Sequence, residues 1–135
     1  MNVQDAVHAQ YSLKVEPADD VLQVRVSGDV DAQAVRIAYW RQIAALGRER
    51  GVRKLLVVDR RKGVPATPSE LAELAHLFHG EAEHFDRVAV VEPTPEFLPA
   101  IEPAEILGQD AGINVRVFGE VAPALRWLRY GSPDD

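Results

Sequence analysis

Hydrophobic and polar residues alternate along two segments near the start of the chain, 11–17 and 21–28. Each run places its apolar residues on one face: Tyr11, Leu13 and Val15 in the first, and Leu22, Val24 and Val26 in the second. A period of two is typical of a strand with one buried face. The turn residues of PADD (17–20) separate the runs, so we predict an antiparallel hairpin with one solvated face.

Two amphipathic helices are predicted from apolar residues at helical spacing. The first follows Asp29 and Asp31, which are candidate N-caps, and ends before Gly51, a residue type favoured just beyond a helix. Its inner stripe comprises Val35, Tyr39, Ile43 and Leu46. The second begins at TPSE (67–70), which combines a capping box with proline at the first helical position. Its inner stripe comprises Leu71, Leu74, Ala75 and Phe78.

Three further strands are predicted, at 54–59, 87–92 and 114–119. The runs KLLVVD and RVAVVE are typical of parallel strands that are covered on both sides. Between the last two strands lies a proline-rich segment, PTPEFLPAIEP (93–103), in which prolines recur at positions 95, 99 and 103. A proline within a helix costs roughly 3 kcal/mol, so we predict a broken turn and then a short helix from about Pro103 to Ala111, stopped by Gly112. A closing helix is predicted over 121–130.

The predicted order of elements is therefore β-β-α-β-α-β-α-β-α. A hairpin followed by alternating strands and helices indicates an α/β fold with a five-stranded, mainly parallel sheet, one antiparallel strand and about four helices. We expect a single domain over residues 11–130, with flexible ends at 1–10 and 131–135. The loops after the strands at 54–59 and 87–92 should emerge side by side at one edge of the sheet, where open α/β sheets bind ligands.

Composition narrows the classes of function. The 135 residues are 47% hydrophobic and 27% charged, which is typical of a globular protein. The net charge of −6 disfavours general nucleic-acid binding, which needs an excess of Lys and Arg. The lack of cysteine excludes disulfides, thiolate metal sites and cysteine nucleophiles. The N-terminus has no signal-peptide pattern and no apolar run approaches the roughly 20 residues of a membrane span, so a cytoplasmic location is expected.

Four segments together resemble a STAS-type domain, the fold of the bacterial anti-sigma-factor antagonists, and in particular its small stand-alone bacterial members. They are LQVRVSGDVDAQ (22–33), RKLLVVDRR (53–61), RVAVVEP (87–93) and INVRVFGEVAPALRWL (113–128). The resemblance implies a non-enzymatic regulatory or ligand-binding module. In the antagonists, an Asp-Ser-Ser-Gly or Asp-Ser-Thr-Gly motif follows a strand-ending aspartate, and phosphorylation of its first serine by a partner kinase releases the partner. Here Asp59 matches the aspartate, TPSE (67–70) stands where the motif would be, and Ser69 is the positional match for the phosphorylated serine.

The loop after the strand at 54–59, the basic loop (59–69), supports three interpretations. Its candidate site residues are Asp59, Arg60, Arg61, Lys62, Thr67 and Ser69. The three cations could bind an anion or a partner. A phosphate on the serine or threonine would lie in the first turn of a helix, where backbone N–H groups favour negative charge. Alternatively, the threonine only caps the helix, the cations form a solvated loop, and the aspartate caps a turn rather than acting as a base.

Catalytic and metal-binding signals are weak. Glu73, His76 and His79 recur at helical spacing with His84 beyond them, but they fall opposite the core stripe and predict a polar surface rather than a zinc site. The sequence contains no nucleophile elbow, phosphate-binding loop or dinucleotide motif. We therefore expect no enzyme activity, no metal and no cofactor.

Two functions remain open at this point. Phe97, Leu98 and Ile101 either line a small apolar pocket or plug one end of the core, and Trp40 is either an interface aromatic or a packing residue. The first function is a regulatory module that binds a protein partner, with homodimerisation as an open option. The alternative is a carrier or sensor of an anionic or amphiphilic small molecule whose head group lies near the basic loop. A closed apolar cavity beside Phe97 and Ile101 would favour the carrier, and a filled core the partner-binding module.

Overall fold

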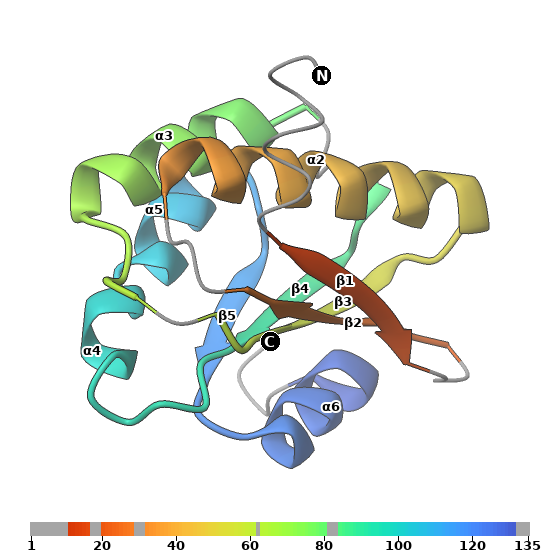
Figure 1. Cartoon of the computed structure of the whole chain (residues 1–135). Coiled ribbons are helices and arrows are strands. Elements are labelled where there is room, and N and C mark those ends of the chain that lie inside the picture. Colours follow the sequence, from red (N-terminus) through yellow and green to blue (C-terminus); the bar gives the residue numbers. More distant parts are fainter. Residues whose placement is uncertain (1–10, 17–19, 29–31, 62, 81–83, 132–135) are drawn as a thin grey trace.

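A five-stranded sheet forms the centre of the computed structural model, which describes residues 11–16, 20–28, 32–61, 63–80 and 84–131 (Figure 1). The strands follow one another across the sheet in chain order: β1 (Ser12–Glu16), β2 (Leu22–Ser27), β3 (Lys54–Asp59), β4 (Arg87–Val91) and β5 (Val115–Phe118). β1 pairs antiparallel with β2, and the remaining neighbours pair in parallel. The predicted fold class is confirmed.

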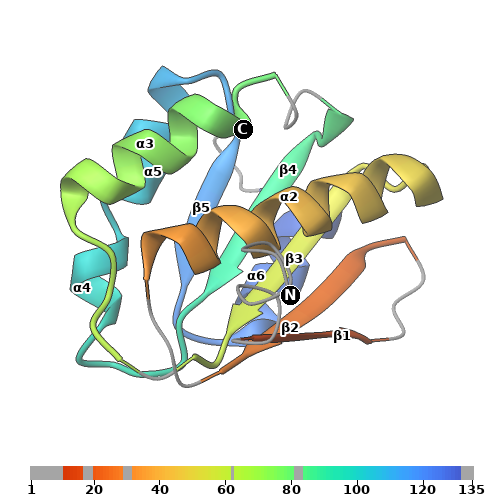
Figure 2. The ribbon, with the colours of Figure 1, turned by 45° about the horizontal axis from the view of Figure 1, so that its top comes forward.

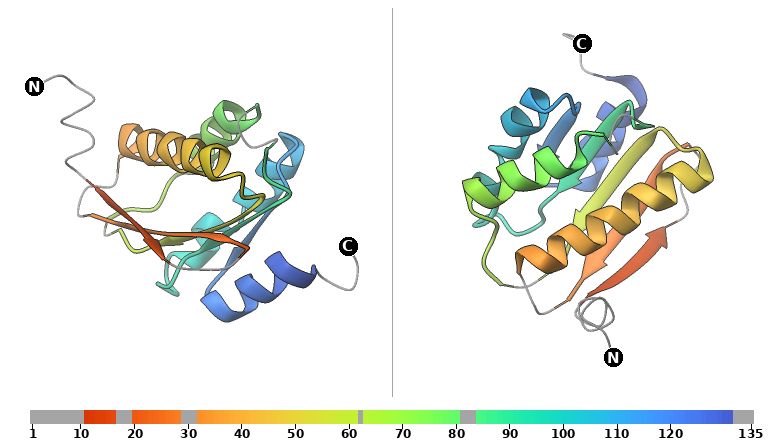
Figure 3. Two further views of the ribbon diagram at one scale, coloured as in Figure 1. Left: turned by 90° about the vertical axis from the view of Figure 1, so that its right-hand side faces the viewer. Right: turned by 90° about the horizontal axis from the view of Figure 1, so that it is seen from above.

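Helices cover both faces of this sheet. One face carries α2 (Gln33–Arg50), α3 (Pro68–Phe78) and α5 (Ala104–Asp110), with the one-turn α4 (Leu98–Ile101) beside them. Figure 2 shows α2 and α3 side by side over the strands. The other face carries α6 (Val121–Tyr130), which the two views of Figure 3 place across the sheet from α2.

The alternation of side chains along β3 explains why this strand is apolar at nearly every position. Leu55 and Val57 belong to the core beneath α2, whereas Leu56 and Val58 belong to the core against α6. All four are at most 2% exposed. A central parallel strand covered on both sides requires this continuous apolar run.

The register of the central strands determines which residues meet at the carboxyl edge of the sheet. Val58 of β3 lies opposite Val91 of β4. The next residue on each strand is acidic, Asp59 and Glu92, so two carboxyl groups leave the sheet side by side. The basic loop and the proline-rich segment therefore start from the same edge, as the sequence predicted.

The helix boundaries differ from the predicted ones in two places. α2 begins after Ala32, which makes no side-chain cap, and the candidate caps Asp29 and Asp31 lie outside the described residues. The expected broken turn contains α4, because Pro99 falls in its first turn, where a missing N–H removes no helical bond. The predicted short helix is α5, which ends before Gly112 at φ 81°.

Gly51 terminates α2 in the left-handed conformation (φ 66°), as predicted. Of the predicted flexible ends, 1–10 and 131–135, all residues but Gly131 fall outside the described residues. Within the described residues, no helix combines the length and apolar character needed to cross a lipid bilayer.

Candidate functional site

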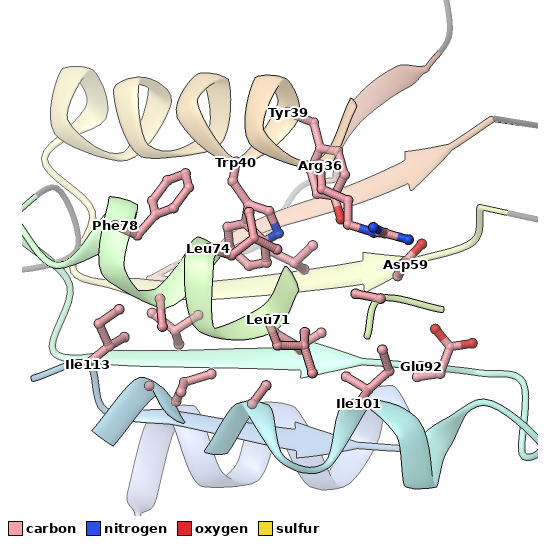
Figure 4. A pocket seen from close by; sticks show the side chains of 18 of the residues that line it. Arg36, Tyr39, Trp40, Asp59, Leu71, Leu74, Phe78, Glu92, Ile101 and Ile113 are labelled. Atoms are coloured by element: carbon pink, nitrogen blue, oxygen red, sulfur yellow. The ribbon is translucent and has the colours of Figure 1, made fainter. Parts of the chain in front are cut away.

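An apolar cavity of about 130 Å³ lies between the sheet and the helices α2, α3 and α5 (Figure 4). Its walls include Trp40, Leu71, Phe78, Ile101 and Ile113. A single water needs roughly 10–15 Å³ of such volume, so the cavity is large enough for a small organic molecule. Apolar side chains of this kind form cavities that bind apolar molecules.

Small residues on the facing helices leave this volume unfilled. Ala44 of α2, Ala75 of α3, and Ala104 and Gly108 of α5 all line the cavity. At Gly108 an added Cβ would overlap the side chain of Val115, so the glycine lets α5 approach β5 closely. The helical stripe of α3 is accordingly only partly buried: Leu71 and Phe78 are buried, whereas Leu74 and Ala75 are half-buried.

Four charged side chains gather at the end of the cavity nearest the carboxyl edge of the sheet: Arg36, Asp59, Arg61 and Glu92. Figure 4 shows Arg36, Asp59 and Glu92 on the same side of the cavity, away from Phe78 and Ile113 at the other end. The cavity thus has an apolar body and one polar end.

Arg61 is an inward-facing residue and not a solvated cation. Its guanidinium donates to both carboxylate oxygens of Asp59, from Nε at 3.1 Å and from Nη2 at 2.8 Å, and its backbone N–H donates to the same carboxylate at 3.0 Å. The guanidinium also lies 4.7 Å from the centre of the Tyr39 ring. The Arg61 side chain is only 5% exposed. Arg60 is exposed, and Lys62 lies outside the described residues.

Arg36 joins the start of α2 to the basic loop and to α3. Nη2 donates to the carbonyl oxygen of Val64 at 3.1 Å, and Nη1 donates to the side chain of Gln33 at 3.2 Å and lies 3.3 Å from a carboxylate oxygen of Glu70. The Arg36 side chain is 4% exposed. Sequence reasoning missed this residue, since one arginine beside a helical apolar stripe carries no spacing signal.

Glu92 is the second residue that sequence reasoning missed. It is 6% exposed, and its Oε1 accepts a hydrogen bond from the backbone N–H of Thr94 at 3.2 Å. Burial, and secondly the negative charge of Asp59, raise the pKa of Glu92. The sequence did contain a signal for it: two neighbouring apolar runs, KLLVVD and RVAVVE, both end in an acidic residue.

Thr67 and Ser69 lie at the start of α3, outside the cavity lining. The predicted capping box is confirmed: Thr67 Oγ1 accepts from the N–H of Glu70 at 3.2 Å, and Glu70 Oε1 accepts from the N–H of Thr67 at 3.0 Å. Both Thr67 and Ser69 are exposed. A role in phosphorylation stays a prediction for these two residues.

The structure separates the three apolar residues of the proline-rich segment. Phe97 and Ile101 line the cavity. Leu98 does not, and lies beside Gly119, where an added Cβ would be 3.4 Å from its Cδ2. Trp40 packs between the Tyr39 and Phe78 rings, with centroid distances of 5.9 and 5.8 Å, and so acts as a packing residue that also lines the cavity.

A hollow on the surface adjoins the polar end of the cavity. Asp59, Arg61, Gly63 and Phe97 line both, while Arg60, Pro93 and Thr94 line only the hollow. The basic loop and the proline-rich segment therefore form the two sides of one opening.

The polar side chains of α3 have other roles than binding a metal. Glu73 accepts a hydrogen bond from Gln33 Nε2 at 2.8 Å, and His79 Nδ1 contacts the carbonyl oxygen of Ala111. In the part of the chain that the structure describes, no three His, Asp or Glu side chains come together as a metal site.

Comparison with known proteins identifies the family of this fold. Individual curated proteins gave no significant match. The sequence model of the SpoIIAA-like family matches residues 21–129, which include four of the five strands and every residue that lines the cavity. This match confirms the resemblance to a small STAS-like domain and points to a regulatory module of the STAS type. The chain belongs to the SpoIIAA-like family.

Proposed function

We propose that the protein is a STAS-type module that binds a small, mainly apolar molecule in the cavity between the sheet and α2, α3 and α5. The cavity itself carries this proposal, because a module that works only through its surface needs no space in its core. Phe97 and Ile101 lie in the lining of the cavity, which supports a ligand carrier.

The distribution of polar groups also supports ligand binding. Small-molecule sites are mostly hydrophobic with a few polar groups that orient the ligand. Here the charged side chains are confined to one end of an apolar volume. The same end adjoins the surface hollow, which supplies an entry route between Gly63 and Phe97.

The test uses N-phenyl-1-naphthylamine, an uncharged apolar fluorophore, and two matched variants of α3. Ala75 lines the cavity, whereas Ala72 is exposed on the same helix. We expect a saturable rise in fluorescence with the wild type. Ala75→Leu should weaken binding at least about tenfold by filling the cavity, and Ala72→Leu should leave it within about twofold. Unsaturable binding, or equal loss in both variants, would refute the proposal.

A second candidate function is binding of a protein partner by the basic loop. The observation that favours it is the exposure of Val64, which is 75% exposed in the same loop as the exposed Arg60. Arg60→Glu and Val64→Ser change this surface without touching the cavity lining. If a partner is retained from native cell extract by the wild type and lost by both variants, the loop is the contact surface. Equal retention by all three proteins removes the loop from consideration.

A further inference from the structure

We infer that the cavity selects molecules whose polar end is an uncharged hydrogen-bonding group, such as a hydroxyl, and that Glu92 binds this group. The inference rests on the proposed ligand binding and specifies the chemistry of the ligand. It differs from the anionic head group that the basic loop suggested from sequence alone.

The cations at the polar end already have carboxylate partners. Two arginines are present in the described lining of the cavity. Arg61 is bound by Asp59 through two side-chain hydrogen bonds, and Arg36 faces Glu70 at 3.3 Å. An anionic ligand would have to share a guanidinium with the carboxylate that it already binds. Because both guanidinium groups are nearly fully buried, bringing a second negative charge beside the first is unfavourable.

Carboxyl groups accompany the arginines at this end of the cavity. Asp59 ends β3 and Glu92 directly follows β4, and both line the cavity, while Glu70 faces Arg36 from α3. A ligand carboxylate placed here would lie beside the Asp59 carboxylate, next to arginines that already bind Asp59 and Glu70. Burial of an ion without an opposite charge is strongly unfavourable.

Glu92 has hydrogen-bonding capacity to offer a ligand. Thr94 contacts its carboxyl group, with the backbone N–H donating to Oε1 at 3.2 Å and the side chain also interacting with it. The two oxygens of a carboxyl group have about four lone-pair sites, so these contacts leave room for a ligand group. Burial and Asp59 both favour the protonated carboxyl, which can donate one hydrogen bond and accept others. A hydroxyl complements this pattern, since it also donates and accepts.

The geometry gives such a ligand a defined orientation. Glu92 lies at the polar end with Ile101 beside it, and Phe78 and Ile113 lie at the other end of the cavity (Figure 4). A hydroxyl at Glu92 would leave an alkyl chain to extend along Leu71 and Leu74 toward Trp40. These side chains supply apolar contact over the whole length of the chain.

The experiment measures displacement of N-phenyl-1-naphthylamine by three probes of equal chain length, octan-1-ol, octanoate and octylamine, at pH 7.5. We expect octan-1-ol to displace the dye at a concentration about tenfold or more below that of either charged probe. Equal or tighter binding of octanoate would overturn the inference in favour of an anion site. Equal or tighter binding of octylamine would overturn it in favour of an ion pair with Glu92.

Variants of Glu92 separate a specific site from the general cost of burying a charge. Glu92→Gln keeps a neutral hydrogen-bonding group, so octan-1-ol should bind as in the wild type. Glu92→Leu should weaken octan-1-ol by about fivefold, whereas Glu49→Leu on the exposed end of α2 should not. Unchanged binding of octan-1-ol by Glu92→Leu, with normal dye binding, refutes this inference alone. Absence of dye binding in the wild type refutes the proposed function, and this inference with it.

Discussion

The carboxylate of Asp59 is held by the guanidinium of Arg61, two residues further along the chain, through hydrogen bonds of 3.1 and 2.8 Å. The pair lines the polar end of the cavity, and the Arg61 guanidinium lies over the Tyr39 ring. Arg61, which the sequence suggested as an anion ligand, is therefore part of the protein interior.

Removal of the Asp59 carboxylate should destabilise the fold. Asp59→Ala leaves the Arg61 guanidinium buried without its partner, and we expect a loss of about 2–4 kcal/mol in the free energy of unfolding, since broken buried pairs cost amounts of this order. Urea denaturation at pH 7 measures the change. Arg60→Ala serves as the control, because Arg60 is exposed and its loss should cost less than about 0.5 kcal/mol. Equal effects of the two variants would contradict a structural role for the pair.

The capping box of α3 gives a second prediction. Thr67→Ala removes the oxygen that accepts from the Glu70 N–H, and should cost about 1 kcal/mol in unfolding free energy. Ser69→Ala is the matched control, because Ser69 is exposed in the same turn and caps nothing in the described structure. Thermal or urea denaturation of both variants distinguishes them. A larger effect of Ser69→Ala would show that the helix start depends on another contact.

Glu92 should make stability fall as the pH rises. The folded pKa of Glu92 is raised above its ordinary value, so the folded state keeps its proton to higher pH than the unfolded state does. Below the unfolded pKa Glu92 is protonated in both states, so it adds no pH dependence to the free energy of unfolding. Between the two values the unfolded state has already released its proton, and each further increase in pH favours unfolding until the folded pKa is passed.

Glu92→Gln tests this pH dependence. Because the amide stays uncharged, its stability relative to the wild type should increase from pH 4 to pH 8 in urea denaturation. Glu96→Gln, an exposed residue of the proline-rich segment, should show no such trend. A difference between Glu92→Gln and the wild type that is independent of pH would mean that Glu92 ionises as readily in the folded chain as in the unfolded one.

Gly47 permits a close approach between α2 and Phe85. A Cβ added at Gly47 would overlap the Phe85 ring. Alanine is better than glycine within a helix by about 1 kcal/mol, but displacement of a packed ring costs about 1–3 kcal/mol. We therefore expect Gly47→Ala to destabilise the protein by about 1 kcal/mol. Ala45→Gly on the exposed face of α2 should lose a similar amount from helix propensity alone, and a stabilised Gly47→Ala would show that the ring can move at little cost.

The elements that could be predicted from sequence are those set by local chemistry. β3 occupies the predicted residues 54–59, and its four central positions are buried on one face or the other. The start of α3 follows from the capping box, and α6 spans the predicted 121–130. The prolines were harder to interpret, since Pro99 in the first turn of a short helix is compatible with helical structure and Pro99 in mid-helix is not.

The site could be predicted only in outline. Adjacent strand ends were enough to bring the basic loop and the proline-rich segment together. The cavity was not predictable in its extent, because it depends on the separation of α2, α3 and α5 and on alanines whose neighbours come from other helices. Nor does a sequence pattern state that Arg61 turns inward to Asp59, or that Glu92 is buried, since both follow from tertiary packing.

The cavity draws its walls from most of the chain, from Arg36 on α2 to Val115 on β5. A molecule bound there would pack against segments that are distant in sequence and would become part of the protein interior. Occupancy would then resist unfolding of the whole domain, by about 2.7 kcal/mol at a free concentration one hundred times the dissociation constant. Melting temperature thus offers a readout by which candidate compounds can be ranked before the physiological one is identified.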